Sequence, residues 1–181
     1  MNEPSNFCDD SCGTASPPAP ALQPGERDVN HPPYKIKNVK GELYAKTVST
    51  NATHASGMLE YDVHNLFGYQ ILNATNYGLT NTFPGKRPFI IGRSTFAGSS
   101  IWAGHWGGDN YAQWDSMAWS IPQGLTFSLF GMSMFGVDTC GFSGTATEEL
   151  CGRWMQLSAF FPFYRNHYAQ GSLKHEPWRK Y

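Results

Sequence analysis

The sequence predicts an α/β fold built from consecutive β/α units, and two observations carry this prediction. Segments with apolar residues at helical spacing alternate with short apolar runs flanked by turn residues. Polar side chains capable of chemistry follow each of these short runs. Alternation of helices and buried strands is typical of parallel sheets, in which helices connect the strands.

The N-terminal part of the chain lacks this pattern. Residues 1–55 are predicted to be mostly irregular, and 13–57 to be a loop-rich insertion. The segment Gly13–Pro33 is rich in proline, alanine and glycine, which is typical of a long surface loop. Residues Tyr34–Thr50 alternate weakly and allow a short hairpin.

The first predicted helix covers Ser56–Leu79, where apolar residues form one stripe at helical spacing. These residues are Leu59, Val63, Leu66, Phe67 and Ile71. Gly78 is a plausible C-terminal stop signal. The run Arg87–Gly92 is expected to be a buried strand, followed by a long loop that continues through Asp109.

The second half of the chain repeats the alternation. The predicted elements are a helix over Tyr111–Phe130, a strand over Met132–Val137, a helix over Ala146–Ala159 and a strand over Phe161–Tyr164. Pro122 predicts a kink or break in the first of these helices. Thr145 or Thr147 is expected to cap the second.

The polar residues that follow the predicted strands are Arg93, Asp109, Asp138, Arg165 and His167. The active site of a (β/α)₈ barrel is built at this end of its strands, and a doubly wound sheet follows a similar rule. Three β/α units do not close a barrel. The sequence therefore predicts part of a larger barrel, with these side chains at one edge of its sheet.

Composition narrows the class of ligand. The net charge of the 181 residues is -1, which provides no basic field for nucleic acid or an anionic membrane surface. No apolar run reaches the roughly 18 to 20 residues of a membrane span. Aromatic residues make up 15% of the chain, a share that suits neutral ligands with flat faces such as carbohydrates. The alternative is that the aromatic residues simply fill the core.

Cysteines and glycosylation signals indicate the compartment. The four cysteines are Cys8, Cys12, Cys140 and Cys151, which allow three pairings. Local pairing, of Cys8 with Cys12 and of Cys140 with Cys151, closes short loops and is favoured here. Asn51 and Asn73 each begin an N-glycosylation signal. Together these features favour a secretory or lysosome-like compartment. The N-terminus lacks a signal peptide, so we expect the chain to be a fragment.

The segment His105–Asn110 is the strongest candidate for chemistry. Its two glycines allow a backbone to approach a ligand closely. Trp106 offers a flat apolar face to a sugar ring, and Asp109 can act as an acid or base. The alternative is an ordinary turn with a half-buried tryptophan. His105 and Asp109 lack a third ligand at useful spacing, so neither a metal nor a cofactor is expected.

Several segments, in order along the chain, carry a resemblance to a known family. They are Met1–Phe7, Arg87–Phe89, Gly92–Gly98, Gly104–Asn110, Gly136–Phe142, Glu148–Cys151 and Phe161–His167. Together they resemble the catalytic barrel of glycoside hydrolase family 31, in its maltase-glucoamylase, sucrase-isomaltase and acid α-glucosidase branch. The resemblance is weakest over Gly13–Gly57. It implies roughly the second half of a (β/α)₈ barrel.

The resemblance implies a retaining exo-α-glucosidase that removes terminal glucose from maltose-like oligosaccharides. Retention needs two carboxyl groups about 5–5.5 Å apart. Asp109 resembles the acid/base. The nucleophile of relatives lies in a Trp-x-Asp-Met-Asn-Glu motif, which places it just before Met1 and outside this chain. We therefore expect the isolated chain to be inactive. A catalytically dead carbohydrate-binding or structural fragment is the alternative, and α-xylosidase or α-glucosyltransferase specificity stays open.

The resemblance also assigns substrate-binding residues. They are Arg93 and His167 as hydrogen-bonding groups, and Trp106, Phe142 and Met1 as walls of the pocket. Asp138 and Arg165 resemble pocket-lining residues, and a structural ion pair between them is an equal alternative. The pairing of Arg93 with a structural acid is the alternative for that residue.

Overall fold

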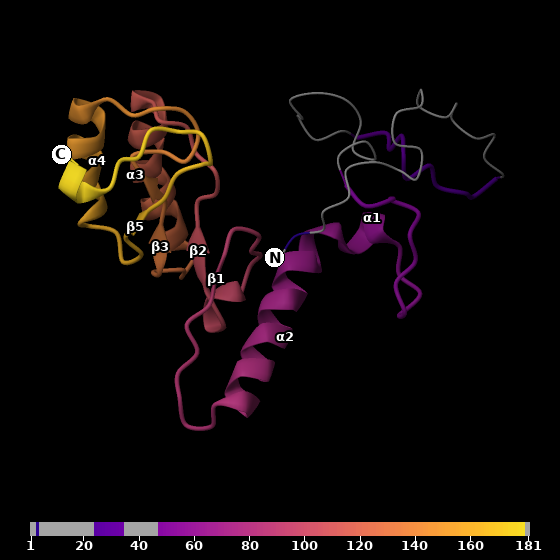
Figure 1. Cartoon of the computed structure of the whole chain (residues 1–181). Helices are drawn as coiled ribbons and strands as arrows, with labels where there is room; N and C mark the ends of the chain where they lie inside the picture. The colour runs from indigo at the N-terminus through magenta and orange to yellow at the C-terminus, as the bar shows by residue number, and fades with distance from the viewer. Residues whose placement is uncertain (1–2, 4–23, 35–46, 180–181) are drawn as a thin grey trace. The chain divides into compact units, whose positions relative to one another are not determined.

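The computed structural model describes residues 3, 24–34 and 47–179 (Figure 1). These residues divide into two compact units, one that ends at Phe67 and one that begins at Gly68. The predicted site residue Met1, the cysteines Cys8 and Cys12, and most of the hairpin segment lie outside the described residues. The extent of the 13–57 insertion stays a prediction.

The first unit is organised around the buried side chain of Glu60. This residue begins helix α1, Glu60–Val63, which is followed by the 3₁₀ turn η2, His64–Leu66. His54 Nε2 lies 2.7 Å from Glu60 Oε2, and His64 Nδ1 lies 3.1 Å from Oε1. The predicted helix start at Ser56 is wrong, because Thr53 pairs antiparallel with Leu59 and the residues between them form a turn, which the Gly57 N–H closes by donating to the His54 carbonyl at 2.8 Å.

The chain contains three longer helices among its described residues. The first starts at Phe67, the last residue of the first unit, and the other two lie within the second unit. They are α2 over Phe67–Thr82, α3 over Trp114–Leu129 and α4 over Glu148–Ser158. Helix α2 continues past Gly78. The residue range of α3 runs unbroken through Pro122, so a break there is wrong, and the alternative of a kink stays a prediction. Thr147 caps α4, since its hydroxyl accepts a hydrogen bond from the Leu150 N–H at 3.2 Å.

The strands of the second unit are short and parallel. They are β1 over Ile91–Gly92, β2 over Gly104–Trp106, β3 over Phe135–Gly136, β4 over Asp138–Thr139 and β5 over Arg165–Asn166. Strand β2 lies between β1 and β3, with His105 opposite Gly92 and Phe135. Strand β4 pairs with β5, with Asp138 opposite Arg165. The predicted parallel pairing is confirmed. The short 3₁₀ turns η3, Ser99–Ile101, and η4, Pro177–Arg179, complete the elements.

Two strand predictions are corrected by the structure. Gly104–Trp106 was expected within a loop, but it is strand β2. A Cβ at Gly104 would meet the Met134 carbonyl oxygen at 2.5 Å, so only glycine permits this close approach of neighbouring backbones. The run Phe161–Tyr164 was expected to be a strand. Its first N–H instead bonds to Ser158 O at 3.0 Å, which closes a turn after α4, and β5 begins at Arg165.

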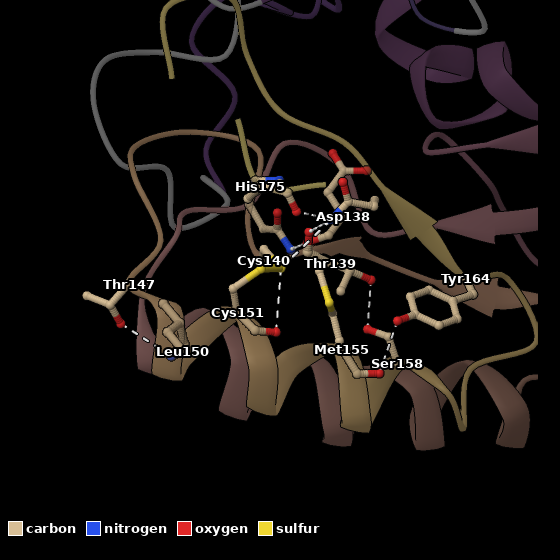
Figure 2. Close-up of a disulfide and its surroundings, with 12 residues drawn as sticks. Asp138, Thr139, Cys140, Thr147, Leu150, Cys151, Met155, Ser158, Tyr164 and His175 are labelled. Carbon is tan, nitrogen blue, oxygen red and sulfur yellow. Dashed lines mark hydrogen bonds between the residues drawn. A yellow bond between two sulfur atoms is a disulfide. The ribbon is translucent and has the colours of Figure 1, made fainter. Parts of the chain in front are cut away.

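The buried core of this unit connects α4 to the strands. Its members are Phe135, Val137, Cys140, Ala146, Leu150, Cys151 and Trp154. Cys140 and Cys151 form a disulfide, which confirms the local pairing favoured for these two cysteines (Figure 2). The Thr139 hydroxyl donates to Ser158 Oγ at 2.8 Å and joins β4 to α4. The residues next to Asp138 are therefore fixed by covalent and polar contacts.

Candidate active site

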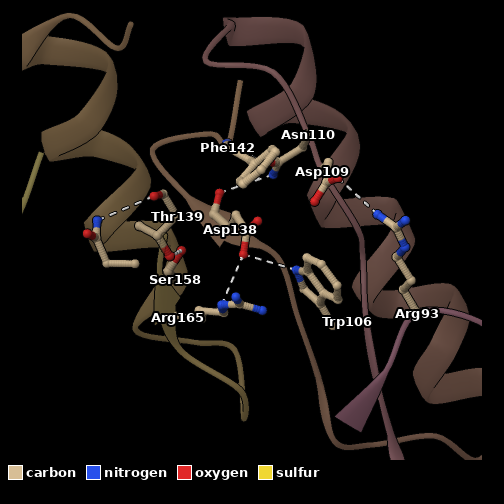
Figure 3. A network of polar contacts seen from close by, with 10 residues as sticks. Arg93, Trp106, Asp109, Asn110, Asp138, Thr139, Phe142, Ser158 and Arg165 are labelled. Carbon is tan, nitrogen blue, oxygen red and sulfur yellow. Dashed lines mark hydrogen bonds and ion pairs between the residues drawn. The ribbon is translucent and has the colours of Figure 1, made fainter. Parts of the chain in front are cut away.

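The polar residues predicted at strand ends do come together. Arg93 follows β1, Trp106 ends β2, Asp138 begins β4 and Arg165 begins β5. Figure 3 shows these side chains gathered beside Asp109, which follows β2 after two glycines. Gly108 has a φ of 82°, a left-handed conformation that glycine adopts without steric cost. This turn delivers Asp109 to the site.

Asp109 is paired with Arg93. Arg93 Nη1 lies 3.0 Å from Asp109 Oδ2, and the two side chains are 36% and 41% exposed. The carboxylate is thus held in place by a guanidinium group and stays accessible from solvent. The accessibility of the carboxylate suits a group that exchanges protons with a bound ligand.

Trp106 lies between two arginines in Figure 3. The Arg165 guanidinium lies 4.7 Å from the centre of the indole ring, and the Arg93 guanidinium lies 5.5 Å from it. Guanidinium groups at such distances are attracted electrostatically to the face of an indole ring. The two arginines therefore fix the plane of Trp106.

Asp138 is completely buried. Trp106 Nε1 donates a hydrogen bond to Asp138 Oδ1 at 3.0 Å, and Arg165 Nε lies 3.5 Å from the same oxygen. Oδ2 has no hydrogen-bond partner among the described residues. Burial raises the pKa of Asp138 to about 7, against the opposing effects of Arg165 and the Trp106 N–H. The ion pair of Asp138 with Arg165, one of the two alternatives from the sequence, is present.

His167 and Phe142 form the other side of the candidate site. Their rings stack with centres 5.2 Å apart. Burial lowers the pKa of His167, and the neighbouring positive charge of Arg165 lowers it further. A neutral imidazole both donates and accepts hydrogen bonds, which suits a sugar hydroxyl.

The sequence reasoning missed the role of Asn110. Its side-chain N–H donates to the Asp138 carbonyl at 3.1 Å, and its Oδ1 accepts from the Phe142 N–H at 3.0 Å. Its carbonyl oxygen also accepts from the N–H groups of Phe142 and Ser143, each at 2.9 Å. Asn110 thus ties the Asp109 loop to the segment after β4. Its place directly after Asp109 in the sequence is the signal that could have identified it.

His105 is part of the core beneath the site. It is 7% exposed, and its ring stacks on Phe127 with centres 3.9 Å apart. Thr95 Oγ1 lies 3.0 Å from Nδ1. Burial lowers the pKa of His105 to about 4, so the ring is neutral near pH 7. Within the described ranges, no group of three or more histidine, cysteine, aspartate or glutamate residues is arranged to hold a metal ion.

Asn51 and Asn73 are both exposed, as glycosylation requires, and their modification stays a prediction. None of the helices described here is long and apolar enough to cross a membrane.

A groove of about 430 Å³ lies apart from these residues. It is lined by Phe89, Ile90, Met132 and Met134, which precede strands β1 and β3. The candidate site lies beyond the opposite, C-terminal ends of β1, β2 and β3. Since chemistry in β/α barrels takes place at that end, we do not place it in the groove.

Comparison with known proteins identifies the family. Residues 1–180 match the family model described as "Glycosyl hydrolases family 31 TIM-barrel domain". The chain is 62% identical over 159 residues to an alpha-glucosidase of Aspergillus niger, covering 86% of this chain and 16% of that protein. It is 60% identical over 158 residues to an alpha-glucosidase of Aspergillus oryzae, covering 86% of this chain and 16% of that protein.

A solved structure shows the same fold. The glucosidase II alpha subunit in its Glc1Man2-bound form superimposes with a TM-score of 0.72 at 35% identity, covering 76% of this chain and 15% of that chain. The chain spans about one sixth of the length of the curated relatives it matches. The family match covers nearly every residue, and the chain belongs to glycoside hydrolase family 31, as part of its TIM barrel.

Proposed function

We propose that this chain supplies the acid/base side of the active site of a retaining α-glucosidase. The substrate class is terminal α-linked glucose of maltose-like oligosaccharides. The observation that carries the proposal is the accessible carboxylate of Asp109, held at 3.0 Å by Arg93 beside Trp106. Relatives of the chain are named alpha-glucosidases, which supports this choice of substrate.

In this proposal Asp109 transfers protons in both halves of the reaction. The protonated carboxyl group first gives its proton to the glycosidic oxygen as the bond to the sugar breaks. The resulting carboxylate then takes a proton from the incoming water. The nucleophile is a second carboxylate outside this chain, as the family resemblance implies. Asp138 does not serve in that role, because it is completely buried and held by Trp106 and Arg165.

The neighbouring side chains bind the sugar ring in this proposal. Arg93 and neutral His167 hydrogen-bond to its hydroxyl groups. Trp106 and Phe142 present ring faces to it, with Met1 as a further wall. A secretory or lysosome-like location is part of the proposal and rests on the Cys140–Cys151 disulfide.

The test uses a chimera, in which this chain replaces the matching segment of the Aspergillus niger alpha-glucosidase. We expect the chimera to release glucose from maltose. Asp109→Asn should lower kcat for maltose by roughly 10²- to 10⁴-fold, the usual contribution of general acid–base catalysis. An aryl glucoside with a good leaving group should lose less in the bond-breaking step, because its oxygen needs no proton.

Asp115→Asn is the matched control, since Asp115 is an exposed carboxylate in the first turn of α3. Its kcat should stay within about twofold of the parent, because surface substitutions have small effects. A parent chimera that binds glucose but does not hydrolyse maltose would favour the dead carbohydrate-binding alternative. Equal activity of Asp109→Asn and the parent would remove Asp109 from the acid/base role.

A further inference from the structure

Five side chains of the site form a continuous polar chain. From one end to the other they are Asp109, Arg93, Trp106, Arg165 and Asp138 (Figure 3). The carboxylates stand at the two ends, and the indole lies in the middle. We call Arg93, Trp106 and Arg165 the stacked unit. Asp109 contacts it through Arg93, and Asp138 contacts it through both Arg165 and Trp106.

Asp138 anchors this unit through a single oxygen. Its Oδ1 accepts from Trp106 Nε1 at 3.0 Å and lies 3.5 Å from Arg165 Nε. Asp138 is itself held by its neighbours in sequence. Its own carbonyl accepts from Asn110 Nδ2 at 3.1 Å, and Thr139 beside it bonds to Ser158 of α4. The anchor is therefore fixed to the sheet and to α4, whereas Asp109 lies on a loop.

We propose that Asp138 is a positioning residue, which orients Asp109 by fixing Trp106 and Arg165 and, through Trp106, Arg93. This inference deepens the proposed function and rests on it for the role of Asp109. A positioning role fits Asp138 better than a sugar-binding role, because its carboxyl group is fully buried and Oδ1 is bonded to protein groups. Because Asp138 orients Asp109, its loss should lower kcat more than it raises KM, although Trp106 and Arg93 also contact the sugar in the proposed function.

The protonation state of Asp138 controls how firmly the unit is held. The charged groups that act on it are Arg165 on β5, Arg93 after β1 and Asp109 after β2. The two arginines favour its carboxylate form, and Asp109 and burial oppose it. A pKa of about 7 follows from this balance. When Asp138 takes up a proton, its attraction to Arg165 is lost.

Two variants separate positioning from folding. Asp138→Asn keeps an oxygen that can accept from the Trp106 N–H but removes the charge opposite Arg165. Trp106→Phe keeps an aromatic ring near the arginines but removes the N–H. Glu149→Gln is the matched control, since Glu149 pairs with Arg153 at 3.0 Å on the exposed face of α4.

The first experiment measures kcat, KM and their pH profiles in the chimera. Asp138→Asn should lower kcat for maltose roughly ten- to hundredfold, the cost of a misplaced catalytic group, with KM within about threefold of the parent. The limb of the kcat profile near neutral pH should disappear.

A double variant tests whether both residues act through the stacked unit. Trp106→Phe should lower kcat less in the Asp138→Asn background than in the parent, because both substitutions disturb the same unit. A raised KM with unchanged kcat would instead make Asp138 a sugar ligand, and parental values in both parameters would also overturn the proposal.

The second experiment does not depend on catalysis. The indole N–H of Trp106 is followed by NMR in the full chain, with Trp106→Phe used to assign its signal. The signal should shift in one titration step near neutral pH, and the shift should be absent in Asp138→Asn and present in Glu149→Gln. No shift in the parent chain would overturn the proposal. If the parent chimera is inactive, the proposed function fails and this titration alone decides the role of Asp138.

Discussion

His105 and Asp138 are both buried ionisable side chains, and burial acts on them in opposite directions. The pKa of His105 falls from 6.5 to about 4. At pH values between these two pKa values, His105 is protonated in the unfolded chain but not in the folded one, so the free energy of unfolding rises with pH. The pKa of Asp138 rises from 3.8 to about 7. Here the folded chain binds the additional proton, so stability falls as pH rises. Each slope is about 1.4 kcal/mol per pH unit.

These two slopes overlap between about pH 4 and 6.5, and single variants should expose them. In Asp138→Asn the His105 contribution remains, so stability relative to the parent should increase with pH. In His105→Phe the Asp138 contribution remains, and relative stability should decrease with pH. Urea unfolding of the full chain at several pH values measures both. Parallel pH profiles for the parent and both variants would contradict this account.

At the scale of elements, glycines set how closely the short strands approach their neighbours. A Cβ at Gly136 of β3 would overlap the backbone carbonyl of Phe163, which precedes β5. Gly152 lies inside α4, where an added Cβ meets nothing within 4 Å. The same residue type is therefore required for packing in the strand and is merely tolerated in the helix.

Replacing each of these glycines with alanine should have opposite effects. Gly136→Ala should destabilise the chain by about 3 kcal/mol, since a backbone carbonyl cannot move aside cheaply. Gly152→Ala should stabilise it by about 0.5–1 kcal/mol, because alanine favours the helix and glycine costs more entropy on folding. The urea midpoints of the two variants provide the comparison. A destabilised Gly152→Ala or a neutral Gly136→Ala would show that the local packing differs from the structure.

At the scale of the whole molecule, many large apolar side chains of the second unit remain exposed. Helix α3 contributes Trp119, Leu125 and Leu129, the last of them 86% exposed, and Phe89 and Ile101 lie near β1. Soluble monomers rarely leave so many such side chains uncovered. The strands described also form two small parallel sheets rather than a closed barrel. We infer that these side chains pack against the rest of a family 31 enzyme.

Dye binding tests this inference. The full chain alone should bind an environment-sensitive hydrophobic dye strongly, because its apolar side chains face solvent. The chimera, at the same molar concentration, should bind less dye and should melt at a higher temperature. Equal dye binding by both proteins would mean that the chain covers these side chains without additional sequence.

The sequence by itself determined the α/β class, the parallel pairing and the place of Arg93, Asp109 and Asp138 after the C-terminal ends of β1, β2 and β3. Arg165 instead begins strand β5. Apolar periodicity carries this information, because burial of an apolar face governs both helices and strands. The family followed from ordered motifs such as Gly104–Asn110 and Phe161–His167. The cap at Thr147 was also predictable, since hydrogen bonding to the first turn of a helix depends only on nearby residues.

Only the tertiary structure decided the remaining features. Strand β2 escaped prediction because its three residues pair with β1 and β3 from distant parts of the sequence. The stacking of both arginines on Trp106, the hydrogen bonds of Asn110 and the burial of Asp138 likewise join side chains that lie up to 59 residues apart, as Trp106 and Arg165 do. Local sequence signals report the preferences of neighbouring residues. The orientation and protonation of Asp138 depend on contacts and burial, which exist only after β1–β5 and the helices have packed together.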